Sequence, residues 1–229
     1  MHKPAKSGNL QMMRMIMGAA VAGLLSSTAF AADLAPASPS YGPVATAYDW
    51  SGAYVGFVAG YLRGESDHTD TFLNTTGPYD IEGAMVGGTV GYNWQWGSVT
   101  YGVEGDFSLA DIAGNTEINC SSCFTNIDNF GTLRARLGYA YDRVMPYATG
   151  GLAFAEMEGG QAGIKVGSRD WVAGWTVGAG IEMALSDKIS AKLEGLYVDL
   201  DDFAYQSGIP VNVSTKDIGI ARVGLNRRF

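Results

Sequence analysis

Residues 50–229 contain eight segments in which apolar side chains alternate with polar or small ones at a period of two. In the last segment, Val223 and Leu225 lie on one face of an extended chain, and Arg222 lies on the other. Such alternation is typical of a β-strand with one apolar face. We therefore predict an all-β fold. The eight predicted strands are 50–63, 82–96, 99–110, 129–141, 144–157, 171–185, 188–200 and 217–229.

The charged residues of these strands are in phase with the glycines and threonines, and the opposite phase is almost purely apolar and aromatic. This pattern predicts an eight-stranded antiparallel up-and-down transmembrane β-barrel, whose apolar face meets lipid and whose polar face lines a narrow lumen. A soluble barrel such as a lipocalin is the alternative. It would enclose the large apolar side chains of eight strands in one small cavity, which they would overfill. The predicted lumen charges are Glu104, Asp106, Arg134, Arg136, Glu182, Lys192, Glu194 and Arg222.

The connections between the predicted strands alternate in length. Short turns are expected around Gly97, Asp142 and Ser186, and the remaining connections are long and polar. An outer-membrane barrel has short turns in the periplasm and longer loops outside the cell. The predicted external loops are 64–81, 111–128, 158–170 and 201–216.

Aromatic residues cluster near the strand ends, where a membrane barrel carries two interfacial girdles. The predicted periplasmic girdle holds Trp50, Trp94, Trp96, Tyr101 and Tyr141. The predicted outer girdle holds Tyr61, Trp171 and Tyr197.

The amino end is predicted to be a secretory signal peptide, residues 1–31, with basic residues before a short apolar run and Ala29-Phe30-Ala31 at the cleavage position. Residues 32–49 hold three prolines and are expected to form a periplasmic linker without a core, ahead of a barrel domain at 50–229. Loss of the leader removes three basic residues from 15 and none of the 23 acidic ones, so the mature net charge is −11. This balance argues against nucleic acid as a partner.

The lumen charges support two interpretations. They can form a gated ion path, or they can form a polar core that pairs its charges because unpaired buried ions are costly. We favour the polar core. No hydrolase, nucleotide-binding or metalloprotease motif occurs in the sequence, so we do not expect an enzyme.

Cys120 and Cys123 are the only cysteines, and both fall in a predicted external loop. A CxxC pair can be a redox motif or half of a zinc site. No second pair and no nearby histidine accompany it, and a secreted route favours a disulfide that braces the loop. We predict that disulfide and no metal.

Several stretches resemble the small outer-membrane β-barrel family of Gram-negative bacteria, which includes porin-like, hemin-binding and opacity-type surface proteins and is related in shape to the OmpA barrel domain. The matching stretches are DWSGAYVG at 49–56, GGTVGYN at 87–93, RARLGY at 134–139, PYATGG at 146–151 and VGLNRRF at 223–229. The resemblance implies location in the cell outer membrane. It also implies that Phe229, the last residue, signals to the barrel-assembly machinery.

Hemin-binding relatives make His68, the one histidine after the leader, a weak candidate for a haem-iron ligand. The simpler interpretation is a solvated residue of the first loop, and no cofactor is expected. We predict a structural surface protein that contacts outer-membrane lipid and supports the envelope. The alternatives are a receptor or adhesin that binds hemin or a host molecule through its loops, and a narrow porin-like channel.

Overall fold

A computed structural model describes residues 48–229 except 71, 73, 121 and 207–209. The predicted signal peptide and most of the predicted linker lie outside the described residues. The described part of the chain has no helix long and apolar enough to cross a membrane. Its elements are β1 Gly52–Asp70, β2 Tyr79–Trp96, β3 Val99–Thr116, β4 Cys123–Tyr139, β5 Val144–Gln161, the 3₁₀ helix η1 Ala162–Ile164, β6 Val166–Ala184, β7 Ile189–Leu200, β8 Phe203–Gln206 and β9 Pro210–Arg228.

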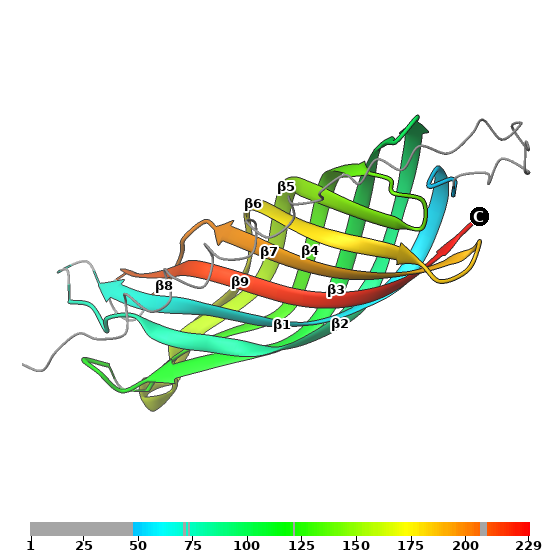
Figure 1. The fold of residues 1–229 in the computed structure, drawn as a ribbon. Coiled ribbons are helices and arrows are strands. Elements are labelled where there is room, and N and C mark those ends of the chain that lie inside the picture. The colour runs from blue at the N-terminus through cyan, green and yellow to red at the C-terminus, as the bar shows by residue number, and fades with distance from the viewer. Residues whose placement is uncertain (1–47, 71, 73, 121, 207–209) are drawn as a thin grey trace, which may run out of the picture. The chain divides into compact units, whose positions relative to one another are not determined.

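The strands pair antiparallel in chain order, and β9 returns to pair with β1, which closes the barrel (Figure 1). The short strand β8 pairs only with the beginning of β9, whereas β7 pairs with the rest of it. β7 and β8 therefore share one position in the wall, and the wall has eight strand positions. The prediction of an eight-stranded antiparallel barrel is confirmed.

Three short connections, between β2 and β3, β4 and β5, and β6 and β7, lie at the same end of the barrel as the C-terminus (Figure 1). Gly97 and Asp142 each have a positive φ there, of 60° and 51°, in the left-handed conformation that tight hairpin turns require. We call this end of the barrel the turn end and the opposite end the tip end.

The strands are longer at the tip end than we predicted. Seven of them have 17–19 residues, whereas a tilted strand needs roughly 9–11 to cross a membrane. Most of the four predicted loops is strand, and the connections shrink to segments such as 117–122 and 162–165. The prediction of long loops is wrong because polar side chains at inward positions hydrogen-bond to one another. The strands therefore continue beyond the point where their outward side chains become charged.

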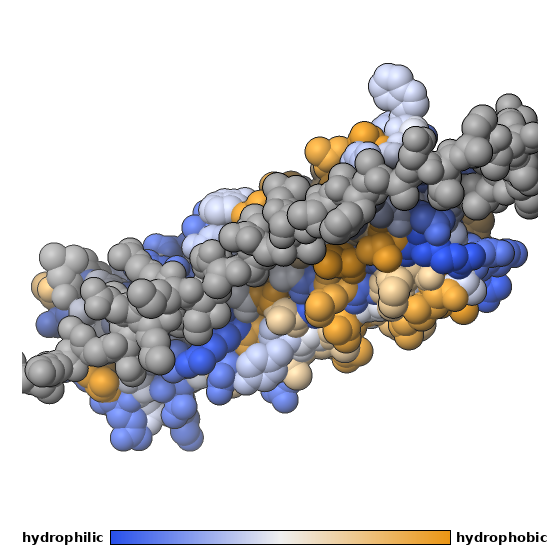
Figure 2. Space-filling model, viewed as in Figure 1, coloured by the Kyte–Doolittle hydropathy of each residue, from blue (hydrophilic) through white to orange (hydrophobic). Residues whose placement is uncertain are grey.

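A belt of large apolar side chains covers the outside of the barrel. In Figure 2 these side chains gather in a band across the visible face, with hydrophilic residues at both ends. The outward phase is the lipid-facing one, as predicted, which contradicts the lipocalin-like alternative. Towards the tip end the belt gives way to exposed charge, such as the ion pair of Arg63 with Asp80. Each wall position contributes to the belt, for example through Phe57, Val90, Phe107, Leu133, Leu152, Trp175, Leu193 and Leu225.

Aromatic residues mark both edges of the belt. Near the turn end, Trp94 stacks on Tyr101 with ring centroids 5.7 Å apart, and Trp96 is 84% exposed. Towards the tip end, Tyr61, Trp171 and Tyr197 point outward. These positions agree with the two predicted girdles, except at Trp50, which lies inside the barrel.

The interior side chains form four layers along the barrel. β1 and the segment before it contribute an inward side chain to each layer. Trp50 belongs to an aromatic layer at the turn end, and Tyr54 belongs to a charged layer above it. Leu62 belongs to an apolar layer, and His68 to a polar cluster at the tip end. The polar lumen that we predicted therefore fills only part of the barrel. The apolar layer includes Ile81, Met85, Ile112, Ile127, Phe130, Met157, Val198, Val213 and Ile218.

Candidate functional site: the filled interior of the barrel

The structure brings all eight predicted lumen charges together in one layer. They come from β3, β4, β6, β7 and β9, and they project inward because they share the phase of the inward glycines. Four acidic and four basic side chains balance, so the layer has no net charge. All eight residues are buried.

The ion pairs of this layer cross the barrel. Lys192 of β7 reaches Glu104 of β3 with Nζ and Oε2 2.7 Å apart. β3 and β7 occupy opposite positions in a wall of eight, so this contact spans the lumen. Arg222 of β9 binds Asp106 of β3 through Nη1 at 2.9 Å and Nη2 at 3.0 Å. At this level the lumen is filled from wall to wall.

Each carboxylate of the layer has more than one partner. Glu194 accepts from Arg134 Nη1 at 2.9 Å and from Arg222 Nε at 2.6 Å. Glu182 accepts from Arg136 Nη2 at 2.7 Å and from Asn226 Nδ2 at 3.0 Å. A carboxylate held by several cations and amides is a poor base or nucleophile, so the geometry favours a structural core over a catalytic pair.

Two inward tyrosines complete the layer and were not among the predicted site residues. Tyr54 donates to Glu104 Oε2 at 2.9 Å, and Tyr147 donates to Glu194 Oε2 at 2.8 Å. The guanidinium carbon of Arg136 lies 4.0 Å from the centroid of the Tyr147 ring. Gly91 leaves room for the ring of Tyr54, because a β-carbon there would overlap it. The signal in the sequence was that both tyrosines share the phase of the glycines.

The residues just before β1 close the turn end from inside. Trp50 is fully buried, its backbone N–H donates to Gln95 Oε1 at 2.6 Å, and its indole Nε1 donates to the carbonyl of Asp142 at 2.9 Å. Arg228 lies over the Trp50 ring, with its guanidinium carbon 4.7 Å from the centroid. Trp50 therefore belongs to an interior plug and not to the lipid-facing girdle that we predicted.

Tyr48 extends this plug. Its backbone N–H donates to Asp142 Oδ1 at 3.1 Å, and its hydroxyl donates to the carbonyl of Asp187 at 3.2 Å. Asp142 and Asp187 belong to two different short turns, so the plug joins these turns to each other. The last two residues of the predicted linker therefore pack against the barrel.

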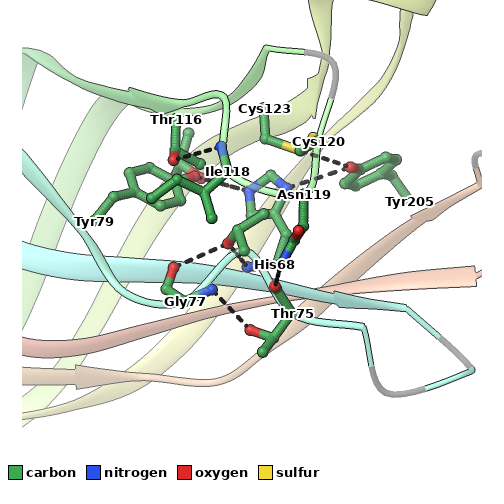
Figure 3. Close-up of a disulfide and its surroundings, with 12 residues drawn as sticks. His68, Thr75, Gly77, Tyr79, Thr116, Ile118, Asn119, Cys120, Cys123 and Tyr205 are labelled. Atoms are coloured by element: carbon green, nitrogen blue, oxygen red, sulfur yellow. Dashed lines mark hydrogen bonds between the residues drawn. A yellow bond between two sulfur atoms is a disulfide. The ribbon is translucent and has the colours of Figure 1, made fainter. Parts of the chain in front are cut away.

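At the tip end, His68 is buried inside the barrel, and our interpretation of it as a solvated loop residue is wrong (Figure 3). Its Nδ1 lies 3.3 Å from the Tyr205 hydroxyl, and its Nε2 lies 2.9 Å from that of Tyr79 and 3.0 Å from that of Thr125. Hydroxyl groups thus engage both ring nitrogens. Ligation of haem iron by His68 stays a prediction, and this geometry offers it no free ring nitrogen.

Burial shifts the protonation of His68. The residue lies beyond the outward charges that end the belt, so it is outside the membrane-spanning part of β1. Removal from water lowers the pKa of His68 from 6.5 to about 4, because burial disfavours the charged ring. The imidazole is therefore neutral at physiological pH.

Cys120 and Cys123 are joined in a disulfide at the start of β4, with their Cα atoms 5.8 Å apart (Figure 3). Cys123 is buried, and its sulfur lies 3.8 Å from the Tyr205 hydroxyl. The neighbouring Asn119 donates through Nδ2 to the carbonyl of Thr75 at 3.1 Å. The disulfide therefore ties the β3–β4 connection to the polar cluster around His68.

Comparison with known proteins gives concordant results. The family model described as "Outer membrane protein beta-barrel domain" matches residues 17–229. The 31 kDa outer-membrane immunogenic protein of Brucella melitensis is 34% identical over 95% of this chain and 100% of its own length. The 25 kDa outer-membrane immunogenic protein of Brucella abortus is also 34% identical, over 89% and 92%. The solved structure of OprG from Pseudomonas aeruginosa aligns with a TM-score of 0.50 at 12% identity, over 78% of this chain and 96% of that one.

Proposed function

Because the chain belongs to the family of outer-membrane proteins with a β-barrel domain, we propose that it is a sealed structural barrel that supports the cell envelope. It is located in the bacterial outer membrane, where its apolar belt contacts lipid. The turn end then faces the periplasm and the tip end faces outward. No catalytic role is part of this proposal.

The observation that carries the proposal is the direct contact of side chains from opposite walls. The pair of Lys192 with Glu104 spans the lumen, and the Trp50 plug and the apolar layer close the barrel below and above it. A conducting pore needs a continuous polar path, and the apolar layer interrupts it. We therefore rank the narrow channel below the structural barrel.

The tip end is the part available to a surface partner. Because most of the predicted loops is strand, a receptor or adhesin would have to use the short connections and the outward faces of the strand ends. The receptor hypothesis remains the alternative that a failure of the structural proposal would favour.

We also propose that the C-terminal strand is the contact with the barrel-assembly machinery. β9 is the strand that closes the wall against β1, and Phe229, a residue that is 73% exposed, follows it at the turn end. An exposed aromatic side chain at this end of the barrel is accessible to a periplasmic factor before closure.

Deletion of the gene and complementation test the structural role. We expect the deletion strain to become sensitive to detergents and to large antibiotics that an intact outer membrane excludes. The wild-type barrel and the surface variant Lys188→Met, in the β6–β7 turn, should restore resistance, whereas a barrel destabilised by Arg222→Met should restore less. An unchanged envelope in the deletion strain would reject the structural proposal.

A further inference from the structure

The outward face of the barrel has a hollow of about 250 Å³ near the tip of the β5–β6 hairpin. It is smaller than the roughly 300–1,000 Å³ of a pocket for a drug-sized molecule, so its size fits a small ligand. Its lining includes Phe124 of β4, Glu158 of β5, and Lys165, Gly167 and Arg169 around the start of β6.

An exposed glycine, Gly167 of β6, lies in the floor of this hollow. Its partner across β5 and β6 is Gly160, which is buried. Phe124 is the cross-strand partner of Gly160 on the other side. A β-carbon at Gly160 would lie 3.2 Å from the Phe124 ring, so the ring lies against this glycine. The half-buried Phe124 ring thus forms one wall of the hollow, and the exposed backbone of Gly167 lies in its floor.

The rim below this floor is polar and nearly balanced in charge. Arg169 Nη2 lies 2.6 Å from Glu158 Oε2 and 2.7 Å from Asp128 Oδ2, and its side chain is still 47% exposed. Glu158 is also partly exposed. Lys165, on the opposite side of the floor, makes no ion pair with any residue that the structure describes. The hollow therefore presents exposed acceptors and donors side by side.

We propose that this hollow binds one neutral pyranose ring of a surface saccharide. The apolar face of a sugar ring fits against Phe124, and vicinal hydroxyl groups match Glu158 as acceptor and Arg169 as donor. A strongly charged ligand is less suitable, because Asp128 and Glu158 largely neutralise Arg169. An aliphatic ligand would leave the polar rim unpaired.

The position of the hollow agrees with such a ligand. Trp171 marks the outer edge of the belt on β6, and Gly167 lies four residues beyond it on the same face, about 13 Å along the strand. The hollow therefore lies above the lipid, within the layer occupied by glycolipid sugars and surface polysaccharides. The sugar can therefore come from the cell's own outer leaflet or from a soluble or foreign glycan.

The test uses the mature protein in phospholipid nanodiscs without glycolipid. The probes are the methyl glycosides of glucose, galactose and mannose, and the measurement is saturation-transfer NMR at millimolar sugar. We expect transfer to at least one glycoside. Phe124→Leu should weaken it about fivefold by removing the stacking surface, whereas Phe72→Leu, the same change at an exposed tip-end aromatic, should leave it unchanged.

A second variant keeps the test decisive if Phe124→Leu folds poorly. Glu158→Gln should also weaken binding, while Arg169 keeps Asp128 and Glu156 as ionic partners. Competition by glycolipid placed in the nanodisc would support a ligand from the same leaflet, and binding without such competition would support a soluble glycan. No transfer to any of the three glycosides would overturn the proposal, as would equal transfer in the wild type and both variants.

Discussion

Replacement of Arg222 by methionine tests whether the charged layer holds the barrel together. The side chain is buried, and methionine keeps most of its length and volume while removing the charge. Asp106 would lose both of its contacts with the Arg222 guanidinium, and Glu194 would lose its 2.6 Å bond from Arg222 Nε.

The magnitude follows from these three contacts. A hydrogen bond to a charged group contributes about 1.5–3 kcal/mol, but the two carboxylates keep other partners, which offsets part of the loss. Thr132 and Arg134 still contact Asp106, and Arg134 still contacts Glu194. Removal of one member of a buried ionic network costs about 3–5 kcal/mol. We expect a decrease of about 4 kcal/mol in the free energy of unfolding.

The assay is urea unfolding in lipid vesicles, followed by tryptophan fluorescence and by the fraction of protein that runs as the compact form on an unboiled gel. Arg227→Met is the matched control, because this arginine lies on the same strand but points outward and makes no ion pair among the described residues. Its effect should stay within about 0.5 kcal/mol. A loss below about 1 kcal/mol for Arg222→Met would refute the structural role of the layer.

Three further predictions concern the two ends of the barrel. The His68 pKa of about 4 lies below its unfolded value of 6.5, so neutral His68 contributes stability that is present above pH 6.5 and lost as pH falls towards 4. Relative to His68→Gln, the wild type should lose about 3 kcal/mol over that range in urea titrations at several pH values, and a pH-independent difference would contradict the burial. Trp50→Ala should lower the free energy of unfolding by about 3–5 kcal/mol, because it empties the plug and removes the indole hydrogen bond to the carbonyl of Asp142, and a change below about 1 kcal/mol would place Trp50 outside the core. Replacement of both Cys120 and Cys123 by serine should cost at most about 2 kcal/mol in chemical unfolding, because the ring that they close is short, and a larger loss would show a wider role for the disulfide.

Much of the fold follows from period-two alternation. The phase of Arg222 and Glu104 against that of Leu225 and Val103 fixes which face meets lipid, since a one-residue shift would invert every side chain. The strand order follows because each short turn forces neighbouring strands to pair. These features depend on local pattern, which the sequence displays directly.

The tip end was harder to predict, because the inward positions of its strands are polar. Hydropathy therefore no longer marks these segments as strands. Ser66, His68 and Thr125 are polar residues at inward positions, and they are buried because they satisfy one another's hydrogen bonds. The polar composition of these tip-end segments is by itself typical of a loop. Only the positions of the partners across β1 and β4, which are distant in sequence, convert such a segment into strand.

The plug was missed for a related reason. Trp50 begins a strand-like segment, and an aromatic residue at a strand end is typical of an interfacial girdle. Its burial depends on Gln95 at the end of β2 and on Asp142 in the β4–β5 turn, which lie far along the chain. The membership of the charged layer was predictable from phase, but the pairing of Lys192 with Glu104 across the lumen depends on the closure of the barrel.

The central claim is a sealed barrel in the outer membrane, and conductance across a planar lipid bilayer tests it most directly. The sample is purified mature protein whose compact form on an unboiled gel shows that it is folded. We predict no discrete conductance steps for the wild type. Regular steps whose size shifts in Arg134→Gln or Glu104→Gln would contradict the account and establish the charged layer as an ion path.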